Sequence, residues 1–294
     1  MFALIGKDLS LSYYLLFRLP DVMTTIAVWK TSTIESHLGN PAIWIVSDSR
    51  ASRTIKDTTT VLTDKCAKLI EIETRVSING SIEKRTILVA VAGNTLVAHN
   101  TIFCAQLSLR YLVGPSFPTL LEIGHYIRDV LLNITKDVGF ALGAGAECEV
   151  LIIGRDPVSP KIYALKPQYL PNIDYSIEEI LHFPYVTGSD KEQYLAVIEK
   201  MMNEEIDQEL LDQVPIRAFD RLFVANKASN KTGGELQIVA IGEKEFQRYM
   251  PLRWNESTNL YEFYMFGMDT WGKKIGACGI GIWPWHLGDV ESQT

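Results

Sequence analysis

The chain has 294 residues, 47% of them hydrophobic, and carries a formal net charge of −7 at pH 7. That length can bury the core of one large domain, or of one domain with an appendage. The acidic balance and the lack of a basic stretch exclude a general nucleic-acid binder, because contacts to phosphates need a basic face. Four cysteines without paired spacing and five scattered histidines predict neither a disulfide framework nor a metal site. A cytoplasmic location is the simplest setting.

Residues 1–23 are the first segment. The apolar run is interrupted by Lys7, Asp8 and Arg18, and it is too short and too charged for a membrane helix. Three interpretations stay open: a propeptide that is removed, a start wrongly assigned ahead of Met23, or a retained N-terminal arm. The common signatures of metalloproteases, serine hydrolases and P-loop proteins are absent from the whole chain.

The stretch from Met23 to Lys30 predicts a strand, and the chain is organised around it. If the residues before Thr24 are absent, this threonine carries a free α-amine next to its hydroxyl. An α-amine titrates at about 7.7–8.0, so it can act as a base near neutral pH. One residue could then be nucleophile and base together. If those residues are retained, Thr24 is an ordinary strand residue.

Further strands follow a polar loop. The patterns predict strands over 42–48, 68–73 and 86–92, with a tight turn at Asn79-Gly80. The apolar period then changes to that of a helix over 96–112 and again from Pro118 onward. Strands return at 149–154, 161–166 and 184–187.

The last predicted elements of the domain are two helices and one strand. A helix begins after Gly188-Ser189-Asp190, another covers about 210–228, and the strand covers 235–241. Segregated runs of strands and helices predict sheets covered by helices, not an alternating parallel fold. Residues 252–294 hold four of the six tryptophans. We expect this C-terminal extension to pack on the domain or on a neighbouring subunit, and we assign it no chemistry.

Several blocks together resemble the proteasome β subunits and the bacterial proteasome-like peptidases. They are Thr24-Thr25-Ile26, Ser47-Asp48-Ser49-Arg50-Ala51-Ser52, Asp64-Lys65-Cys66-Ala67-Lys68-Leu69, Ala92-Gly93, Gly188-Ser189 and Gly233-Gly234. The likeness covers about 24–241. It implies an α+β fold, a four-layer αββα sandwich of two antiparallel sheets, in a hydrolase domain over 24–251.

The resemblance also implies catalytic roles. Thr24 would be the nucleophile, and its own amine the proton acceptor. Lys68 would be a buried cation that favours the deprotonated hydroxyl and keeps the amine neutral. Asp48 would pair with Lys68, because a lone buried ammonium loses its proton. The backbone N–H of Gly93 would face the oxyanion, and Ser189 would hydrogen-bond the threonine amine. Four of these residues also have plainer interpretations. Asp48 could be a turn residue and Lys68 a solvated lysine. Gly93 could be the glycine at the start of a helix, and Ser189 the N-cap of the helix that follows.

A second group of residues would bind substrate or support the site. The substrate-binding residues implied are Ser52, Val91, Asn94 and Thr95, with Val91 at the floor of an apolar pocket. The supporting residues are Arg50, Ser229 and Asn230. The family usually has an aspartate before the glycine pair, but residues 228–232 hold no acid, so Ser229 or Asn230 would supply that hydrogen bond. Met23 stands where self-cleaving precursors have glycine, which favours removal of an initiator methionine.

The function implied is a threonine-type endopeptidase without metal or organic cofactor. Its substrate would be a peptide or an unfolded protein, and its assembly a homo-oligomeric ring or stacked rings. No nucleic-acid or membrane partner is expected, and an ATPase partner is left open. Two alternatives stay open: a non-catalytic subunit that retains its N-terminal arm, and an N-terminal nucleophile amidase acting on a small amide.

Overall fold

The structure is a computed structural model of the chain. It describes residues 24–31, 43–55, 58–142, 146–156, 159–169, 173–204, 211–225, 229, 231–242, 246–255, 257, 259–265, 268–269, 274–275 and 278–279. The N-terminal segment 1–23, Asn230 and most of the predicted C-terminal extension therefore lie outside the described residues.

The first sheet is antiparallel and has five strands in the order β11-β1-β2-β12-β13. These strands are β11 (Tyr185–Gly188), β1 (Thr25–Lys30), β2 (Ile43–Ser47), β12 (Gln237–Ile241) and β13 (Phe246–Tyr249). Thr25 pairs with Gly188 on one side, and Ile26 pairs with Ser47 on the other. The start of β1 is thus held between the end of β11 and the end of β2.

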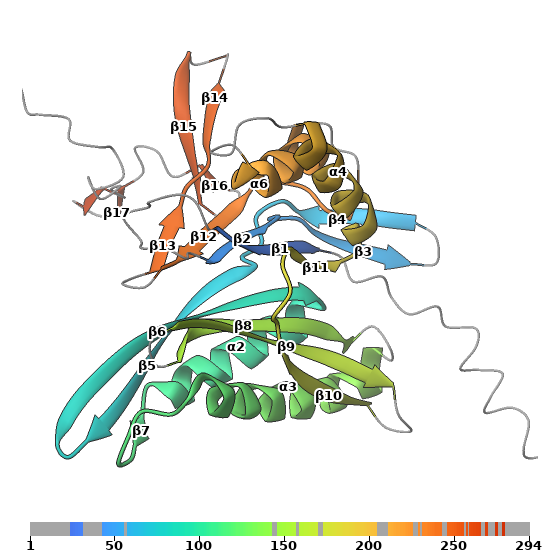
Figure 1. The fold of residues 1–294 in the computed structure, drawn as a ribbon. Coiled ribbons are helices and arrows are strands. Elements are labelled where there is room, and N and C mark those ends of the chain that lie inside the picture. The colour runs from blue at the N-terminus through green and yellow to red at the C-terminus, as the bar shows by residue number, and fades with distance from the viewer. Residues whose placement is uncertain are drawn as a thin grey trace, which may run out of the picture.

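The second sheet has six strands in the order β10-β9-β8-β6-β5-β7, and it is the strongly curled sheet in the lower half of Figure 1. Its strands are β5 (Leu69–Ile78), β6 (Ser81–Gly93), β7 (Leu112–Val113), β8 (Cys148–Asp156), β9 (Ser159–Tyr169) and β10 (Ile173–Glu179). The β5–β7 pair is parallel and the other pairs are antiparallel.

The alternation of β1 explains how the sheets are packed. Ile26 and Val28 point into the core between the two sheets, where they meet Leu88 and Leu151. Ala27 and Trp29 point the other way, into a core shared with helices. Successive strand residues face opposite sides, so one apolar strand serves two cores.

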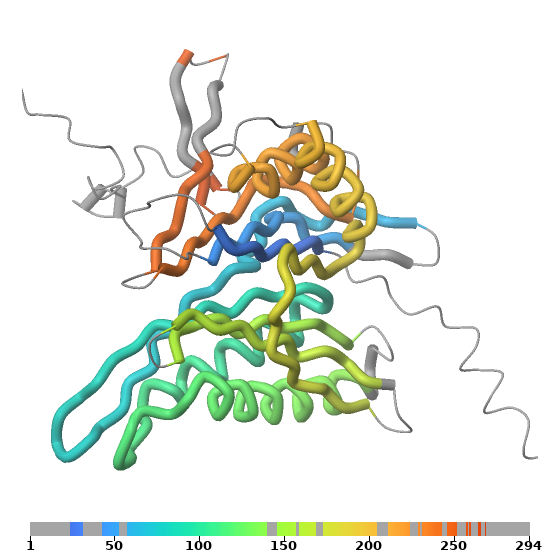
Figure 2. Tube along the Cα trace, viewed as in Figure 1, coloured from blue at the N-terminus to red at the C-terminus, as the bar shows by residue number. Residues whose placement is uncertain are grey.

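Helices lie on the outer faces of both sheets, as Figures 1 and 2 show. The first sheet is covered by α4 (Lys191–Glu204), α6 (Val214–Phe219) and a π-helix, η2 (Asp220–Ala225). The second is covered by α2 (Thr95–Leu109) and α3 (Leu120–Leu142). No helix in the described part of the chain is long and apolar enough to span a membrane.

The predicted four-layer αββα sandwich of two antiparallel sheets is wrong. Strands make up most of the regular structure, the described residues form five sheets, and the larger sheet is curled and includes a parallel pair. The three small sheets consist of β3 (Ala51–Ile55) with β4 (Thr58–Thr63), β14 (Leu252–Asn255) with β15 (Leu260–Met265) and β16 (Met268–Asp269), and β17 (Lys274–Ile275) with β18 (Cys278–Gly279). The sequence analysis predicts none of these small sheets, each of which pairs strands that are neighbours in the sequence.

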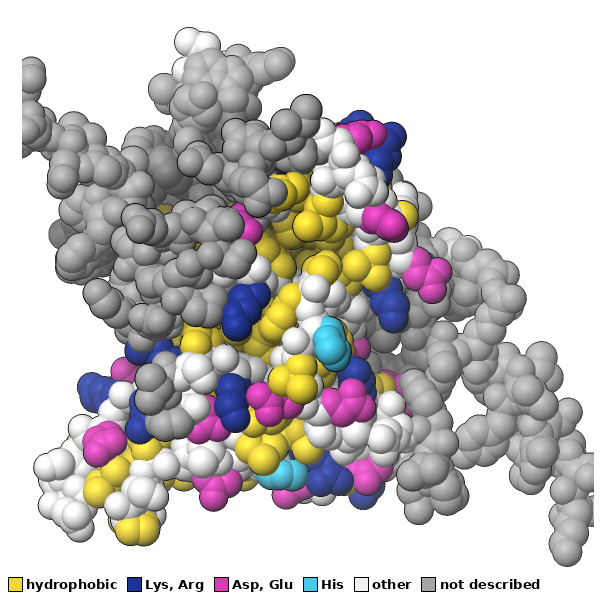
Figure 3. Space-filling view, in the orientation of Figure 1, with side chains coloured by type: hydrophobic (Ala, Val, Ile, Leu, Met, Phe, Trp, Pro, Cys, Tyr) yellow, Lys and Arg dark blue, Asp and Glu magenta, His cyan; other side chains and the backbone are white. Residues whose placement is uncertain are grey.

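The face shown in Figure 3 displays described acidic and basic side chains side by side over the larger sheet and its helices. Opposite charges that are interspersed in this way create no strong field of one sign on that face.

Candidate active site

Thr24 lies immediately before β1 and is fully buried. Its carbonyl oxygen accepts a hydrogen bond from the backbone N–H of Ser189, at 3.0 Å. Gly188 makes this approach possible: its φ is +108°, and a Cβ at that position would lie 1.7 Å from the Thr24 carbonyl oxygen. Only glycine combines this backbone angle with this contact. The backbone of residue 24 is therefore positioned by the end of β11.

Lys68 reaches Thr24 from the start of β5. Its Nζ donates a hydrogen bond to the Thr24 hydroxyl, and the lysine is only 2% exposed. Its backbone is also anchored, because its N–H donates to Oε1 of Gln237 at 2.9 Å. The Gln237 amide group in turn donates to the carbonyl oxygens of Asp48 and Cys66. Gln237, which the sequence analysis did not identify, thus ties the ends of three segments beneath the lysine.

Asp48 follows β2 and is buried. Its Oδ2 accepts hydrogen bonds from the backbone N–H groups of Arg50 (3.1 Å) and Gly233 (3.2 Å), while Oδ1 has no hydrogen-bond partner among the described residues. Burial raises the pKa of this carboxyl group to about 6, against the opposing effects of the Lys68 charge and of the nearby backbone amides. Lys68 and Asp48 interact through their charges, and the described contacts of Asp48 include no direct hydrogen bond to Lys68.

Gly93 ends β6 and approaches from the second sheet. Its φ is +117°, and a Cβ there would lie 2.7 Å from both Cys148 Cα and the Glu147 carbonyl oxygen. Asn94 then caps α2, because its side chain accepts from the N–H of Val97 at 3.0 Å. Gly93 is needed for this close packing whatever its chemistry. Among the contacts of the described residues, none joins it directly to Thr24.

The other predicted substrate-binding residues lie on the same elements. Val91 on β6 is buried in the core beneath α2, and Thr95 is the first residue of that helix. Ser52 lies on β3, and its hydroxyl donates to the Lys231 carbonyl oxygen at 3.4 Å. The Ser189 hydroxyl is buried and has no hydrogen-bond partner among the described residues.

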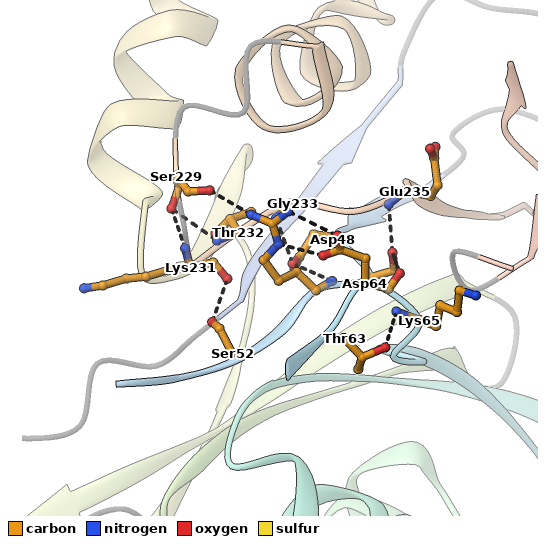
Figure 4. Close-up of polar contacts among 12 residues, drawn as sticks. Asp48, Ser52, Thr63, Asp64, Lys65, Ser229, Lys231, Thr232, Gly233 and Glu235 are labelled. Carbon is orange, nitrogen blue, oxygen red and sulfur yellow. Dashed lines mark hydrogen bonds and ion pairs between the residues drawn. The ribbon is translucent and has the colours of Figure 1, made fainter. Parts of the chain in front are cut away.

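Arg50 contacts the segment that carries Ser229 and Gly233. Figure 4 shows these two residues near Asp48, Asp64 and Ser52. The guanidinium group binds both carboxylate oxygens of Asp64, at 2.7 and 3.3 Å, and donates to the Ser229 carbonyl oxygen at 3.0 Å. A Cβ on Gly233 would lie 2.7 Å from the guanidinium carbon. Arg50 therefore packs under the turn and holds it in place.

Asp190 is the acidic residue that the sequence analysis missed. Its Oδ2 accepts hydrogen bonds from the hydroxyls of Ser229 (2.8 Å) and Thr232 (2.6 Å). The Thr232 hydroxyl is also 2.9 Å from that of Thr25. The only signal in the sequence was the position of Asp190 directly after Ser189. Asn230, the other predicted supporting residue, lies outside the described residues.

Thr24 is thus in direct contact with Lys68 through its hydroxyl and with Ser189 through its carbonyl oxygen. The charge of Asp48 acts on Lys68. A buried ammonium next to a hydroxyl favours the ionised form of that hydroxyl, which is the form that attacks a carbonyl carbon. Among the described residues, no group of three or more His, Cys, Asp or Glu side chains could hold a metal ion.

No protein-family model matches the chain, and no curated protein matches it. Among solved structures, it is similar to Anbu (ancestral beta-subunit) from Yersinia bercovieri, with a TM-score of 0.50 and 14% identity over 76% of this chain and 86% of that chain. An Anbu (Gly-1) mutant from Hyphomicrobium sp. strain MC1 has a TM-score of 0.47 and 12% identity, over the same shares of the two chains.

These comparisons correct the family named from the sequence. The identification with proteasome β subunits and bacterial proteasome-like peptidases is wrong, because the solved structure that shares the fold is Anbu (ancestral beta-subunit) from Yersinia bercovieri. Short motifs spread along a chain do not separate one family from another. At 14% identity, the similarity to the Yersinia protein establishes a shared fold over 76% of the chain.

Proposed function

We propose that the protein is a threonine-type N-terminal nucleophile hydrolase that cleaves peptide bonds within an oligomeric assembly. One observation carries this proposal: the buried Lys68 ammonium donates a hydrogen bond to the Thr24 hydroxyl. Burying a charged lysine is costly, and a plain structural role for Thr24 would not need a cation there. The proposal includes release of Thr24 from residues 1–23, so that its α-amine becomes free.

The chemistry would run through a covalent ester. The Thr24 hydroxyl attacks the substrate carbonyl carbon and gives its proton to the α-amine of the same residue. Lys68 stabilises the negative charge that develops on the hydroxyl oxygen, and the Gly93 N–H faces the oxyanion of the tetrahedral intermediate. When this intermediate collapses, the leaving amine takes the proton and the acyl group stays on Thr24. Water then attacks the ester and releases the acid, with the α-amine again acting as the base.

Asp48 would keep Lys68 charged. An isolated ammonium in a buried site tends to lose its proton, and a neutral lysine could no longer stabilise an oxyanion. The negative charge of Asp48 opposes that loss while leaving the lysine nitrogen in contact with Thr24. The same carboxylate accepts the Gly233 N–H, so it also links the lysine to the turn at 229–233.

The substrate and the assembly follow from the same proposal. An extended peptide or unfolded protein would lie across Ser52 on β3 and the Gly93–Thr95 segment. The neighbour from Yersinia is named an ancestral beta-subunit, and a subunit implies an assembly; we infer a homo-oligomer for this chain. A cytoplasmic location and an ATPase partner belong to the same hypothesis, the latter left open.

A peptide epoxyketone provides the test, because it captures a hydroxyl and a free amine on one threonine. We expect the purified full chain to hydrolyse fluorogenic peptides and to be labelled on Thr24 only. Thr24→Ala should abolish both hydrolysis and labelling, whereas Thr24→Ser, which keeps the amine and a hydroxyl, should retain them. Thr101→Ala is the matched control, since Thr101 is a buried threonine on α2 whose hydroxyl bonds within its own helix.

Two results would point to the alternatives. A chain that retains residues 1–23, hydrolyses nothing and takes no label would be the non-catalytic subunit. A chain that hydrolyses small amides in a Thr24-dependent way, but neither peptides nor epoxyketones of any length, would be the amidase.

A further inference from the structure

An acidic side chain binds the turn beside Thr25 from an unexpected position. Residues 228–232 hold no acid, but the Asp190 carboxylate accepts hydrogen bonds from both hydroxyls of that turn, Ser229 and Thr232. Ser189, directly before it in the chain, donates its N–H to the Thr24 carbonyl oxygen. Asp190 is therefore one residue from a direct contact with Thr24 and linked through the turn to Thr25.

The direction of these hydrogen bonds can be worked out from the donors available. A carboxylate only accepts, so the Thr232 hydroxyl must donate its single proton to Asp190. That hydroxyl can then only accept from Thr25, whose own hydroxyl is 2.9 Å away. The chain of donors runs from Thr25 through Thr232 to Asp190. Both threonines are fully buried, which strengthens each bond and makes its loss costly.

The Ser229 hydroxyl completes the arrangement. It donates to Asp190 and accepts the backbone N–H groups of Lys231 (3.0 Å) and Thr232 (3.2 Å). One carboxylate thereby holds Ser229 and Thr232, next to Gly233, whose N–H binds Asp48. Asp190 stands at the N-terminus of α4, where the helix dipole favours a negative charge.

We propose that Asp190 is the acidic positioning residue of this site, which acts through Thr232 and Thr25 to hold the Thr24 amine in place and to balance the charge of Lys68 there. This inference rests on the proposed function, because it concerns the amine that the hydrolase would use as its base. Asp190 performs from the start of α4 the role that the sequence analysis sought in the turn at 228–232.

The amine would then experience two opposing influences. Lys68 disfavours its protonated form, and Asp190 favours it. The other charged groups near this end of the sheets are Asp48, the Arg50–Asp64 pair, Lys231 on the turn, and Glu149 of β8, which is bonded by Tyr185 and Thr187. All of these groups keep their own charges in Asp190→Asn, and asparagine has nearly the shape of aspartate, so this substitution changes mainly the charge at residue 190.

The test compares Asp190→Asn with a variant that moves the charge. In Asp190→Asn we expect kcat/KM to fall about 10- to 100-fold. We also expect the acidic limb of the pH profile of kcat/KM to move to lower pH by about half a unit to one unit. The pKa of the Thr24 amine falls because its protonated form loses a nearby negative charge. Adding Ser229→Asp to that variant restores a carboxylate at the other end of the same 2.8 Å hydrogen bond, and should move the limb back toward the original pH.

A purely structural role for Asp190 predicts a different result. If it only caps α4, Asp190→Asn would lower stability and kcat but leave the acidic limb where it is, and Ser229→Asp would rescue nothing. Glu122→Gln is the matched control, since this helix-start carboxylate caps α3 through Thr119 far from the site. We expect it to lower stability without moving the limb.

A second readout does not depend on hydrolysis. The Thr24 amine can be titrated directly, by following the pH dependence of its acylation with a small anhydride by mass spectrometry. A lower titration midpoint in Asp190→Asn without any peptide hydrolysis would support the inference and contradict the proposed hydrolase. If Asp190→Asn keeps Thr24-dependent hydrolysis while the acidic limb and the titration midpoint stay unchanged, the hydrolase is supported and the inference about Asp190 is contradicted. A Thr24 amine that is never freed would overturn both.

Discussion

Replacing Asp48 with asparagine should make the protein more stable and less active at the same time. The carboxyl group is buried, and its burial raises its pKa from 3.8 to about 6. The folded state therefore binds the proton more tightly than the unfolded state does. Stability from this group is greatest below about pH 4 and is lost as the pH rises through 6.

The size of the effect follows from the pKa difference. Two units at 1.36 kcal/mol each give about 3 kcal/mol, the free energy that ionised Asp48 costs the folded state above pH 6. Asparagine has nearly the same shape and keeps one oxygen to accept the Arg50 and Gly233 N–H groups. Its amide nitrogen replaces Oδ1, which has no hydrogen-bond partner among the described residues.

The assay is urea denaturation of the wild type and Asp48→Asn at one protein concentration, at pH 4 and at pH 8. We expect the variant to gain up to about 3 kcal/mol at pH 8 and almost nothing at pH 4, while hydrolysis falls because Lys68 loses its counter-charge. Asp174→Asn is the control of opposite sign, since the Tyr175 amide and Arg128 lower the pKa of that exposed carboxyl group. An Asp48→Asn variant that is less stable at pH 8, or equally stabilised at both pH values, would refute the reasoning.

Two further substitutions test the geometry around Thr24. Lys68→Met keeps the volume of the side chain but removes its charge, so hydrolysis should fall at least about 100-fold while the circular dichroism spectrum is unchanged; residual activity near the wild-type level would contradict the role of the cation. Gly188→Ala should abolish activity and lower the melting temperature sharply, because the new Cβ would collide with the Thr24 carbonyl oxygen. Gly80→Ala, at a similar positive φ but with open space around it, should cost only about 1–2 kcal/mol, and equal losses in the two variants would show that backbone strain alone is responsible.

Local pattern was enough to find the strand that carries the site. The stretch from Met23 to Lys30 contains β1 as predicted, and the predicted turn at Asn79-Gly80 joins β5 to β6. The strands of the larger sheet were nevertheless longer than predicted, as β5, β6, β8 and β9 show. β6 runs over 13 residues because its first half is exposed and polar, which hydrophobic pattern does not detect.

The residues of the site that were missed depend on contacts across long sequence distances. Gln237 reaches Lys68 over 169 positions, and Asp190 reaches Thr232 over 42. A polar residue at the start of a strand or helix looks like an ordinary cap until the fold brings its partner near. The same limit explains the wrong architecture: periodicity locates strands, but it does not say that β5 pairs with β7 in parallel or that the larger sheet curls.

The account depends on a free α-amine at Thr24, and intact mass spectrometry of the purified, active protein measures this directly. We expect a mass that corresponds to a chain beginning at Thr24, and a single first residue in N-terminal sequencing. Full peptidase activity in a protein whose mass still includes residues 1–23 would contradict the account, because the hydroxyl would then have no neighbouring amine to accept its proton.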